Sequence, residues 1–281
     1  MQQNKIFACV DGSELTNAIC DYSIFIGNRL EKEVVLLNTV EHTHTSKTTN
    51  LSGNIGLGTS DELLEELANE EAKESKELIA KGKEVLKSCK NSIQEKGFEG
   101  ISTMQRHGSL SENLLELENQ IRVLLIGLKG EVHEKKEGKV GEQVEEIIRG
   151  LHVPTLLVNS SFRPIKKVMI AYDGSASSKK ALDMVASTPI FGDVERHLVS
   201  VNKSDTLLEE AKKVLSSANI EAKITNLEGD PLDELIKYKQ ENEIDIVAMG
   251  AFSHGKLKSV LFGSFTHKML THIKIPLLLL R

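Results

Sequence analysis

The sequence contains the same strand–turn–helix pattern twice, and this internal repeat limits the possible folds more than any other feature. The segment KIFACVDGSELTNAICDYS, which starts at Lys5, returns as KKVMIAYDGSASSKKALDMVAS from Lys166. RVLLIG from Arg122 likewise returns as DIVAMG from Asp245, and HVPTLLVN returns as KIPLLLLR near the end of the second copy. Because the matches keep their order, we interpret the chain as a tandem duplication of one unit.

The spacing between equivalent residues locates an insertion in the first copy. Asp11 and Asp173 are 162 positions apart, whereas Gly127 and Gly250 are 123 apart, so a length change of 39 residues separates the copies. The insertion comprises the polar segment 42–60 and a long predicted helix, which opens with the capping box Thr59-x-x-Glu62. The polar segment is longer than compact domains need, which predicts a mobile or functional loop. One side of the helix would carry Leu64, Ala68, Ala72, Ile79, Leu86 and Cys89.

Each copy alternates apolar strands with amphipathic helices, which predicts an α/β fold. In the second copy we expect strands at 166–172, 195–201, 220–227, 244–249 and 275–280, with helices starting near 177, 204, 231 and 260. The strand cores VMIA, IVAM and PLLLL are continuously apolar, which indicates a parallel sheet covered by helices on both faces. The first helix of the chain would bury Leu15, Ala18, Ile19, Tyr22 and Ile26. The sequence therefore predicts two five-stranded α/β layers.

The predicted domains are 1–160, which contains the insertion, and 165–281, joined by the connector NSSFRPIK. The last strand of each copy is an apolar edge that would invite pairing if it were exposed. Pairing the two edges within one chain would give an intramolecular pseudo-dimer. Further assembly into a homodimer stays open.

Composition narrows the classes of partner and the cellular location. The net charge is -6 and the pI is near 5.9, so a basic footprint for nucleic acid is missing. No apolar run approaches the roughly 20 residues needed to cross a bilayer. The first residues do not form a secretory signal, and Cys9, Cys20 and Cys89 lack the CxxC spacing of a zinc or redox site. We expect a cytoplasmic protein without nucleic-acid or membrane partners.

The segment GAFSHGKLKSVLFGS, which begins at Gly250 after the fourth strand, has the chemistry of an anion site. In an open parallel sheet, ligands collect beyond the carboxyl ends of the strands, where the Asp-Gly-Ser turn after the first strand also lies. Glycines permit close approach of backbone amides to a phosphate, and Lys256 and Lys258 add positive charge.

A short match to a nucleotide motif in this segment is misleading. Gly250 to Lys256 fits the front of a Walker A loop, but Leu257 stands where the magnesium-binding Ser or Thr belongs. The match also follows the fourth strand rather than the first, so we do not interpret it as a P-loop.

These residues and the duplication resemble the universal stress protein family in its tandem two-domain form. ATP-binding members of that family carry G-x-x-G, nine residues and then G-[ST] after the fourth strand, with an Asp at the end of the first. Asp173, Gly250, Gly263 and Ser264 match these positions, and Ser253 stands where the second glycine is expected. The resemblance implies two Rossmann-like domains with strand order 3-2-1-4-5, paired through their last strands.

The resemblance also implies that the second domain holds ATP or ADP, with Mg²⁺ as an optional companion. The residues implied to contact the nucleotide are Ala171, Tyr172, Asp173, Val201, Gly250, Ser253, His254, Gly255, Gly263, Ser264 and Phe265. The first two strand ends would meet adenine or ribose, and the glycine segment would surround ribose and phosphates. Serine at position 253 tolerates positive φ poorly, yet its hydroxyl could bond a phosphate oxygen, so the effect on affinity stays open.

The first copy departs further from this pattern. Gly127 and Gly130 keep the first spacing, but ten residues rather than nine then precede Gly141, which is followed by Glu142. Because a carboxylate at the phosphate end of the loop repels the ligand, we expect this copy to bind nucleotide poorly or not at all.

Structural explanations compete with ligand binding at several of these residues. Asp173 could equally hold its turn by accepting bonds from backbone amides, as Asp11 could in the first copy. His42 and His44 could share a metal with His107, His133 or His152, but exposed loop histidines are the favoured interpretation. His254 has no partner carboxylate at a recognisable spacing, and no catalytic motif is visible, so slow ATP hydrolysis is the most we expect.

Three hypotheses for function follow from these observations. The first is a nucleotide-responsive module of the stress response, which takes ATP or ADP in its second domain and changes its affinity for an unidentified protein partner. The second is a ligand-independent stress or scaffold protein that meets other proteins or small apolar ligands. The third is a weak ATPase.

Overall fold

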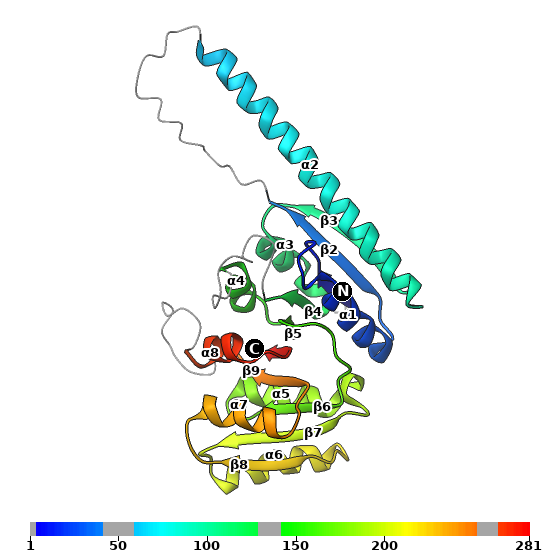
Figure 1. The fold of residues 1–281 in the computed structure, drawn as a ribbon. Helices are drawn as coiled ribbons and strands as arrows, with labels where there is room; N and C mark the ends of the chain where they lie inside the picture. The colour runs from blue at the N-terminus through cyan, green and yellow to red at the C-terminus, as the bar shows by residue number, and fades with distance from the viewer. Residues whose placement is uncertain (1–3, 42–58, 129–141, 252–263) are drawn as a thin grey trace.

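The fold was analysed in a computed structural model that describes residues 4–41, 59–128, 142–251 and 264–281. Two halves, each of five strands, follow one another along the chain (Figure 1). The first half consists of β1 (Lys5–Cys9), α1 (Thr16–Leu30), β2 (Val34–Val40), α2 (Thr59–Glu95), β3 (Ile101–His107), α3 (Leu110–Leu117), η1 (Glu118–Gln120), β4 (Ile121–Gly127), α4 (Glu142–Gly150) and β5 (Thr155–Val158). The second half consists of β6 (Lys167–Ala171), α5 (Ala176–Ser187), η3 (Pro189–Phe191), β7 (Glu195–Val201), α6 (Asp205–Ser217), β8 (Lys223–Leu227), α7 (Pro231–Glu241), β9 (Ile246–Gly250), α8 (Ser264–His272) and β10 (Leu277–Leu280).

The ten strands form one sheet in the order β3-β2-β1-β4-β5-β10-β9-β6-β7-β8. Within each half the strands are parallel, and the order read from the outer edge is 3-2-1-4-5, as predicted. The halves meet where β5 and β10 pair antiparallel, with Leu278 opposite Leu156. The predicted α/β fold class is therefore confirmed.

Helices cover both faces of the sheet and create two apolar cores that each run through both halves. One core packs α1, α2, α5 and α6 against the sheet, with Ile19, Leu86, Leu182 and Leu215 among its buried residues. The other core packs α3, α4, α7 and α8, with Leu114, Ile147, Leu235 and Met269 among its buried residues. The continuously apolar strand segments follow from this arrangement, because both faces of each central strand are covered.

The helix boundaries follow local signals in the sequence. Ser175, Ser204 and Asp230 cap the first turns of α5, α6 and α7 by accepting backbone N–H bonds, and Pro231 occupies the first position of α7. The apolar face predicted for α1 is buried as expected, from Leu15 to Ile26. The last helix, expected from about residue 260, is described from Ser264 onward.

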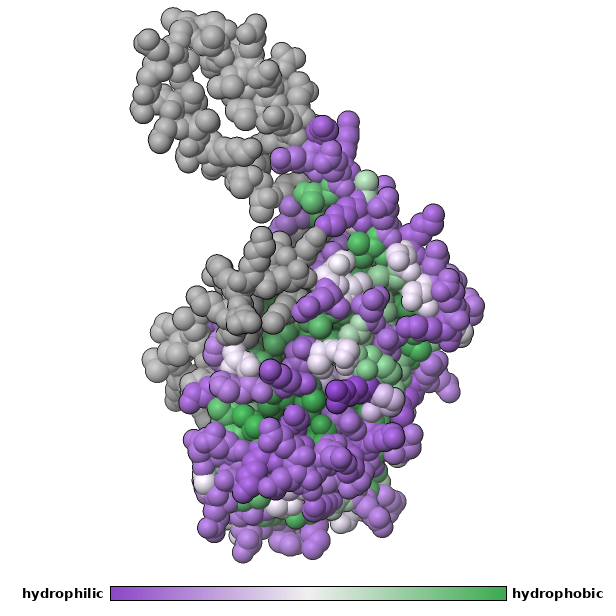
Figure 2. All heavy atoms as spheres, viewed as in Figure 1, coloured by the Kyte–Doolittle hydropathy of each residue, from purple (hydrophilic) through white to green (hydrophobic). Residues whose placement is uncertain are grey.

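The inserted helix α2 differs from the expectation of one continuous buried side. Leu86, Cys89 and Ile93 are buried, whereas Ala72 is exposed and Leu78 is 44% exposed. The beginning of α2 extends past the edge of the sheet (Figure 1). Figure 2 shows mostly hydrophilic residues where α2 leaves the body. The side chains of Leu64 and Ala68 lie outside the described part of the helix.

Side chains also connect the two halves. Arg29 of α1 forms a two-pronged ion pair with Asp193, which precedes β7. Tyr22 is buried and packs edge-on against Phe162 of the connector, with ring centroids 4.8 Å apart, while its hydroxyl accepts the Arg163 N–H at 3.3 Å. These contacts fix the connector against α1.

Candidate functional site

The candidate site lies at the carboxyl ends of β6 and β9, in the second half. β6 pairs with β7 on one side and with β9 on the other, so the segments that follow β6 and β9 leave the sheet at the point where strand order changes direction. Ligands of open α/β sheets bind at such points. The segments in which the sequence predicted a binding site therefore follow strands at this edge of the sheet.

The Asp-Gly-Ser turn after β6 begins helix α5. The Ser175 N–H donates to Asp173 Oδ1 at 3.0 Å, and Gly174 has a φ of +81°, a conformation that favours glycine. Ser175 Oγ in turn accepts the Ser178 N–H at 3.2 Å and caps α5. The turn-holding role considered for Asp173 is thus present in the structure, and any contact with a ligand would be additional.

The strand ends beside this turn offer main-chain rather than side-chain groups. The side chains of Tyr172 and Val201 are buried in opposite cores, and Ala171 packs against the same core as Val201. Ser200, which is buried, donates its hydroxyl to the Tyr172 carbonyl at 2.6 Å and fixes the end of β6 against β7. Burial raises the pKa of the Tyr172 phenol, so this side chain stays neutral at physiological pH.

Gly250 has a packing role that does not depend on a ligand. A Cβ at this position would lie 2.6 Å from the Ser178 nitrogen and 2.7 Å from the Ser177 carbonyl carbon. The end of β9 therefore approaches the first turn of α5 too closely for any side chain. The structure brings Gly250 and the Asp173 turn together through this contact.

The remaining predicted site residues are described only in part. Ser253, His254, Gly255 and Gly263 lie outside the described residues. The helix α8 begins at Ser264, and the half-buried Phe265 packs against the apolar core.

The equivalent edge of the first half contains a cleft. Ser13 N–H donates to Asp11 Oδ1 at 3.0 Å, and Gly12 has a φ of +88°, so the turn repeats that of the second half. Asn38 stands at the position equivalent to Ser200, and its Nδ2 donates to the Val10 carbonyl at 2.9 Å. The cleft has an empty volume of about 660 Å³, open solvent included, and is lined by Cys9, Val10, Asp11, Ser13, Ile19, Leu37, Asn38, Thr39, Leu110, Ile126, Gly127, Leu128, Gln143, Val144 and Ile147.

Sequence reasoning missed several residues at these two edges. Ser200 and Asn38 fix strand ends, and Thr39 lines the first-half cleft. Ser177 and Ser178 lie against Gly250 at the end of β9. Polar residues inside apolar strands could have indicated these positions. Asn38 and Thr39 interrupt the apolar strand VVLLNTV, and Ser200 interrupts HLVSV.

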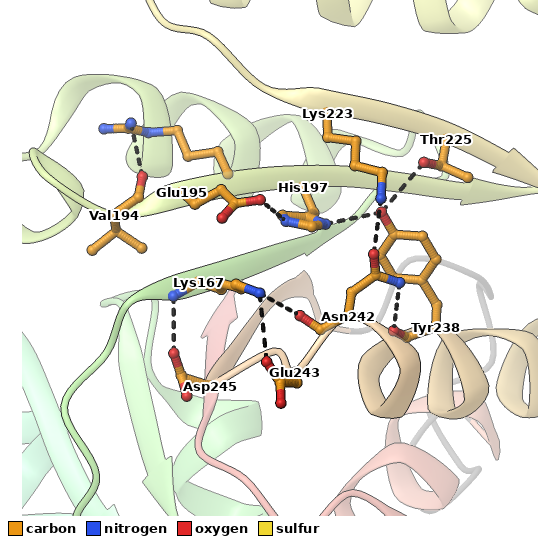
Figure 3. A network of polar contacts seen from close by, with 11 residues as sticks. Lys167, Val194, Glu195, His197, Lys223, Thr225, Tyr238, Asn242, Glu243 and Asp245 are labelled. Atoms are coloured by element: carbon orange, nitrogen blue, oxygen red, sulfur yellow. Dashed lines mark hydrogen bonds and ion pairs between the residues drawn. The ribbon is translucent and has the colours of Figure 1, made fainter.

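A buried polar network lies at the opposite, amino-terminal end of β7 (Figure 3). His197, 2% exposed, has Nδ1 at 2.9 Å from the Tyr238 hydroxyl and Nε2 at 2.7 Å from Glu195 Oε1. The hydrogen bond with His197 lowers the pKa of the Glu195 carboxyl. Because His197 and Tyr238 are buried, we interpret this network as a link between β7 and α7 rather than as a catalytic group.

Neither a metal site nor a membrane span is found in the described part of the chain. There, no three His, Cys, Asp or Glu side chains are grouped so that they could hold a metal ion. His152 lies 3.6 Å from Glu118 Oε1 instead, whereas His42, His44 and His133 are outside the described residues. Among the described helices, none is both long and apolar enough to cross a bilayer.

Comparison with known proteins agrees with this architecture. Residues 188–281 match the model of the universal stress protein family. A universal stress protein of Synechocystis sp. is 33% identical over 285 aligned positions, which cover 99% of each chain. The crystal structure of a universal stress protein from Archaeoglobus fulgidus superposes with a TM-score of 0.75 at 17% identity and covers 100% of this chain and 99% of that one. A functionally unknown protein from Pseudomonas aeruginosa superposes with a TM-score of 0.62 at 13% identity, covering 99% and 92%.

The fold defines a tandem Rossmann-like α/β protein. The full-length similarity then identifies the family, since it extends through the insertion as well as both repeats. The chain belongs to the universal stress protein family.

Proposed function

We propose that the second half binds ATP or ADP and that the protein acts in the cytoplasm as a nucleotide-responsive module of the stress response. One observation supports this most directly. The segment between β9 and α8 starts from Gly250, which lies against the first turn of α5 beside the Asp173 turn. A ligand held by that segment would therefore meet the end of β6 and the start of α5 together.

The chemistry of this edge suits a polyphosphate. The amino terminus of α5 begins directly after the Asp173 turn, and the positive partial charge of a helix amino terminus favours an anion. The segment adds Lys256 and Lys258, together with glycines that permit close backbone approach. In this proposal Asp173 and the main chain at Tyr172 and Val201 meet the nucleoside, and the segment with Ser264 meets the phosphates.

Any bound Mg²⁺ would depend mainly on the nucleotide for its ligands. Asp173 is the carboxylate described at this edge, and its Oδ1 already accepts the Ser175 N–H. The phosphate oxygens and water would supply the other positions, as in many nucleotide sites. Because Asp173 holds its own turn and the sequence shows no catalytic motif, we propose a sensor rather than an enzyme.

A nucleotide sensor needs a conformation of the protein that the bound nucleotide favours. Nucleotide alters the protein only if it binds one conformation more tightly than another. The insertion that contains segment 42–60 is our candidate for the responsive element, and a protein partner would recognise its altered state.

The experiment is to denature freshly purified full-length protein and to analyse the released small molecules by ion-exchange chromatography. Adenine nucleotide is expected from the native sequence. Gly263→Val should abolish the release, because a branched side chain blocks approach of phosphate to the backbone.

The matched control is Gly141→Val, the equivalent change in the first half, which should leave the nucleotide content unchanged. Release of nucleotide from the Gly263→Val protein would contradict the site. Conversion of added ATP to ADP over many turnovers, lost in His254→Ala, would favour an ATPase instead.

A further inference from the structure

Two of the three cysteines lie together where the inserted helix packs on α1. Cys20 of α1 and Cys89 of α2 are 3% and 6% exposed, belong to the same apolar core, and share a hydrogen bond between their thiols. Cys9 is also free and buried, but it belongs to the other core. We propose that Cys20 and Cys89 form an oxidation site at which a small hydroperoxide converts the two thiols to a disulfide. This site does not depend on a bound nucleotide.

Contacts on either side of the thiol pair fix the two segments against each other. On one side, a Cβ on Gly12 would lie 3.1 Å from Cγ2 of Val85, which is one turn before the second cysteine. On the other side, Lys96 forms an ion pair with Asp21, the residue after the first cysteine. The contact between the thiols therefore follows from how α1 packs on the anchored part of α2.

The hydrogen bond makes the two thiols chemically unequal. It lowers the pKa of Cys89, because it stabilises the thiolate, whereas the same bond together with burial raises the pKa of Cys20. Since the thiolate is the reactive form, Cys89 is the sulfur that attacks an oxidant, and Cys20 is the thiol beside it that keeps its proton. Burial keeps Cys9 protonated, because it raises the pKa of that thiol.

The oxidation proceeds in two displacements. The Cys89 thiolate attacks one oxygen of hydrogen peroxide, the O–O bond breaks, and the hydroxide that leaves takes up the proton released by Cys89, which gives a sulfenic acid and water. Cys20 then attacks the Cys89 sulfur, the S–O bond breaks, and the hydroxyl group leaves with the Cys20 proton as a second water. In total, two thiols and one hydrogen peroxide give one disulfide and two waters.

The disulfide would fasten the inserted helix to α1. Sulfur atoms in hydrogen-bond contact need only a short approach to reach the S–S bond of about 2.05 Å. The two cysteines are 69 positions apart in the sequence, and closing so long a loop restricts the unfolded chain. The oxidised protein should therefore be more stable than the reduced protein, and a reducing thiol should reverse the change.

The test is to treat folded full-length protein with millimolar hydrogen peroxide, to digest it without reduction, and to identify the linked peptides by mass spectrometry. We expect one disulfide, between Cys20 and Cys89, with Cys9 left as a free thiol. Oxidation of the same protein in concentrated urea is the control, and there Cys9 should enter the disulfides as well. Free thiols at Cys20 and Cys89 in the treated folded protein, or the same mixture of disulfides as in urea, would overturn the proposal.

Substitutions test the role of each thiol. In Cys20→Ser, Cys89 should stop at the sulfenic acid, which dimedone traps, whereas Cys89→Ser should give no dimedone adduct at Cys20. Cys9→Ser is the matched control and should form the same disulfide as the native protein. Alanine replaces serine at either position where circular dichroism shows that the serine variant is unfolded. A dimedone adduct at Cys20 in Cys89→Ser, without one at Cys89 in Cys20→Ser, would contradict the assigned roles.

The midpoint of thermal unfolding gives a second measurement on the native protein. Peroxide treatment should raise the midpoint by at least about 5 °C, and dithiothreitol should restore the original value. Cys20→Ser should show no such rise. An unchanged midpoint in native protein that contains the disulfide would contradict the proposed fastening of α2. Both measurements are made without added nucleotide, so their outcome is separate from that of the proposed function.

Discussion

The two Asp-Gly-Ser turns show how three residues can shape the chain at the end of a strand. In each turn the Asp carboxylate accepts a backbone N–H two residues later, and the glycine adopts a positive φ of +88° or +81°. The same three residues thus have a structural role in both halves.

Gly250→Ala tests the packing role of the glycine that begins the candidate segment. The added Cβ would overlap the first turn of α5, including the Ser178 nitrogen at 2.6 Å. Overpacking against backbone should lower the free energy of unfolding by about 1–3 kcal/mol, measured by urea denaturation. Gly100→Ala is the control, since a Cβ there would meet Phe98 at an ordinary 3.5 Å. Equal stability of Gly250→Ala and the native protein would contradict the close contact.

The thiols give a prediction that depends on pH. Burial raises the pKa of Cys9, and a hydrogen bond with Cys89 together with burial raises that of Cys20. Both groups should therefore resist a thiol reagent at pH 8 in the folded protein and react after unfolding. Because the unfolded thiols ionise near pH ~8.5 and the folded ones do not, stability should fall as the pH rises above that value. Rapid labelling of the native protein would contradict this.

At the scale of elements, α2 is the part of the structure that departs most from a compact domain. Its second part is anchored through a chain of side chains: Gln105 of β3 donates to the Ile79 carbonyl at 3.1 Å and to Asn38 at 3.2 Å. Asn38 in turn holds the Val10 carbonyl beside the first-half cleft. The anchored part of α2 is thus connected to the first-half cleft, while its first part extends beyond the sheet.

Gly82→Ala tests the anchoring of α2. Helix propensity alone favours alanine by about 0.5–1 kcal/mol. A Cβ at this position, however, would overlap Asn38 Oδ1 and Gln105 Nε2, which are tied by hydrogen bonds. We expect the clash to dominate and to lower the free energy of unfolding by about 1–3 kcal/mol. Lys83→Ala, at the adjacent exposed position, should change stability little, and a more stable Gly82→Ala protein would contradict the contact.

The sequence predicted the positions of the strands and helices better than it predicted which residues contact one another in the fold. Apolar runs located the strands, and the duplication with its family resemblance implied their order. The exposure of Ala72 was not predictable, because helical periodicity does not show where the sheet ends. The packing role of Gly250 was equally hidden, since the atoms that exclude a side chain come from Ser177 and Ser178 on a distant part of the chain. The first-half cleft was not predicted, because its lining comes from β1, β2, β4 and α4, which are far apart in the sequence.

At the scale of the whole molecule, the pairing of β5 with β10 makes one sheet from two repeats. Both apolar cores continue across this seam, so neither half is an independent layer. We propose that domains 1–160 and 165–281 nevertheless mark the two repeats, with the connector fixed by Tyr22 and Phe162.

Leu278→Ala tests the cooperativity of the two halves. Leu278 lies opposite Leu156 at the seam and is 3% exposed. Loss of this buried side chain should cost about 2–5 kcal/mol, and probes in either half should still report a single coincident transition in urea. Two separate transitions in the native protein would contradict the shared core.

The asymmetry between the halves is tested most directly by equilibrium dialysis of full-length protein against labelled ATP. Our account predicts one bound nucleotide per chain, lost in Gly263→Val and retained in Gly141→Val. Two nucleotides per chain, or one that survives Gly263→Val and disappears in Gly141→Val, would show that the first half binds nucleotide and would contradict the account.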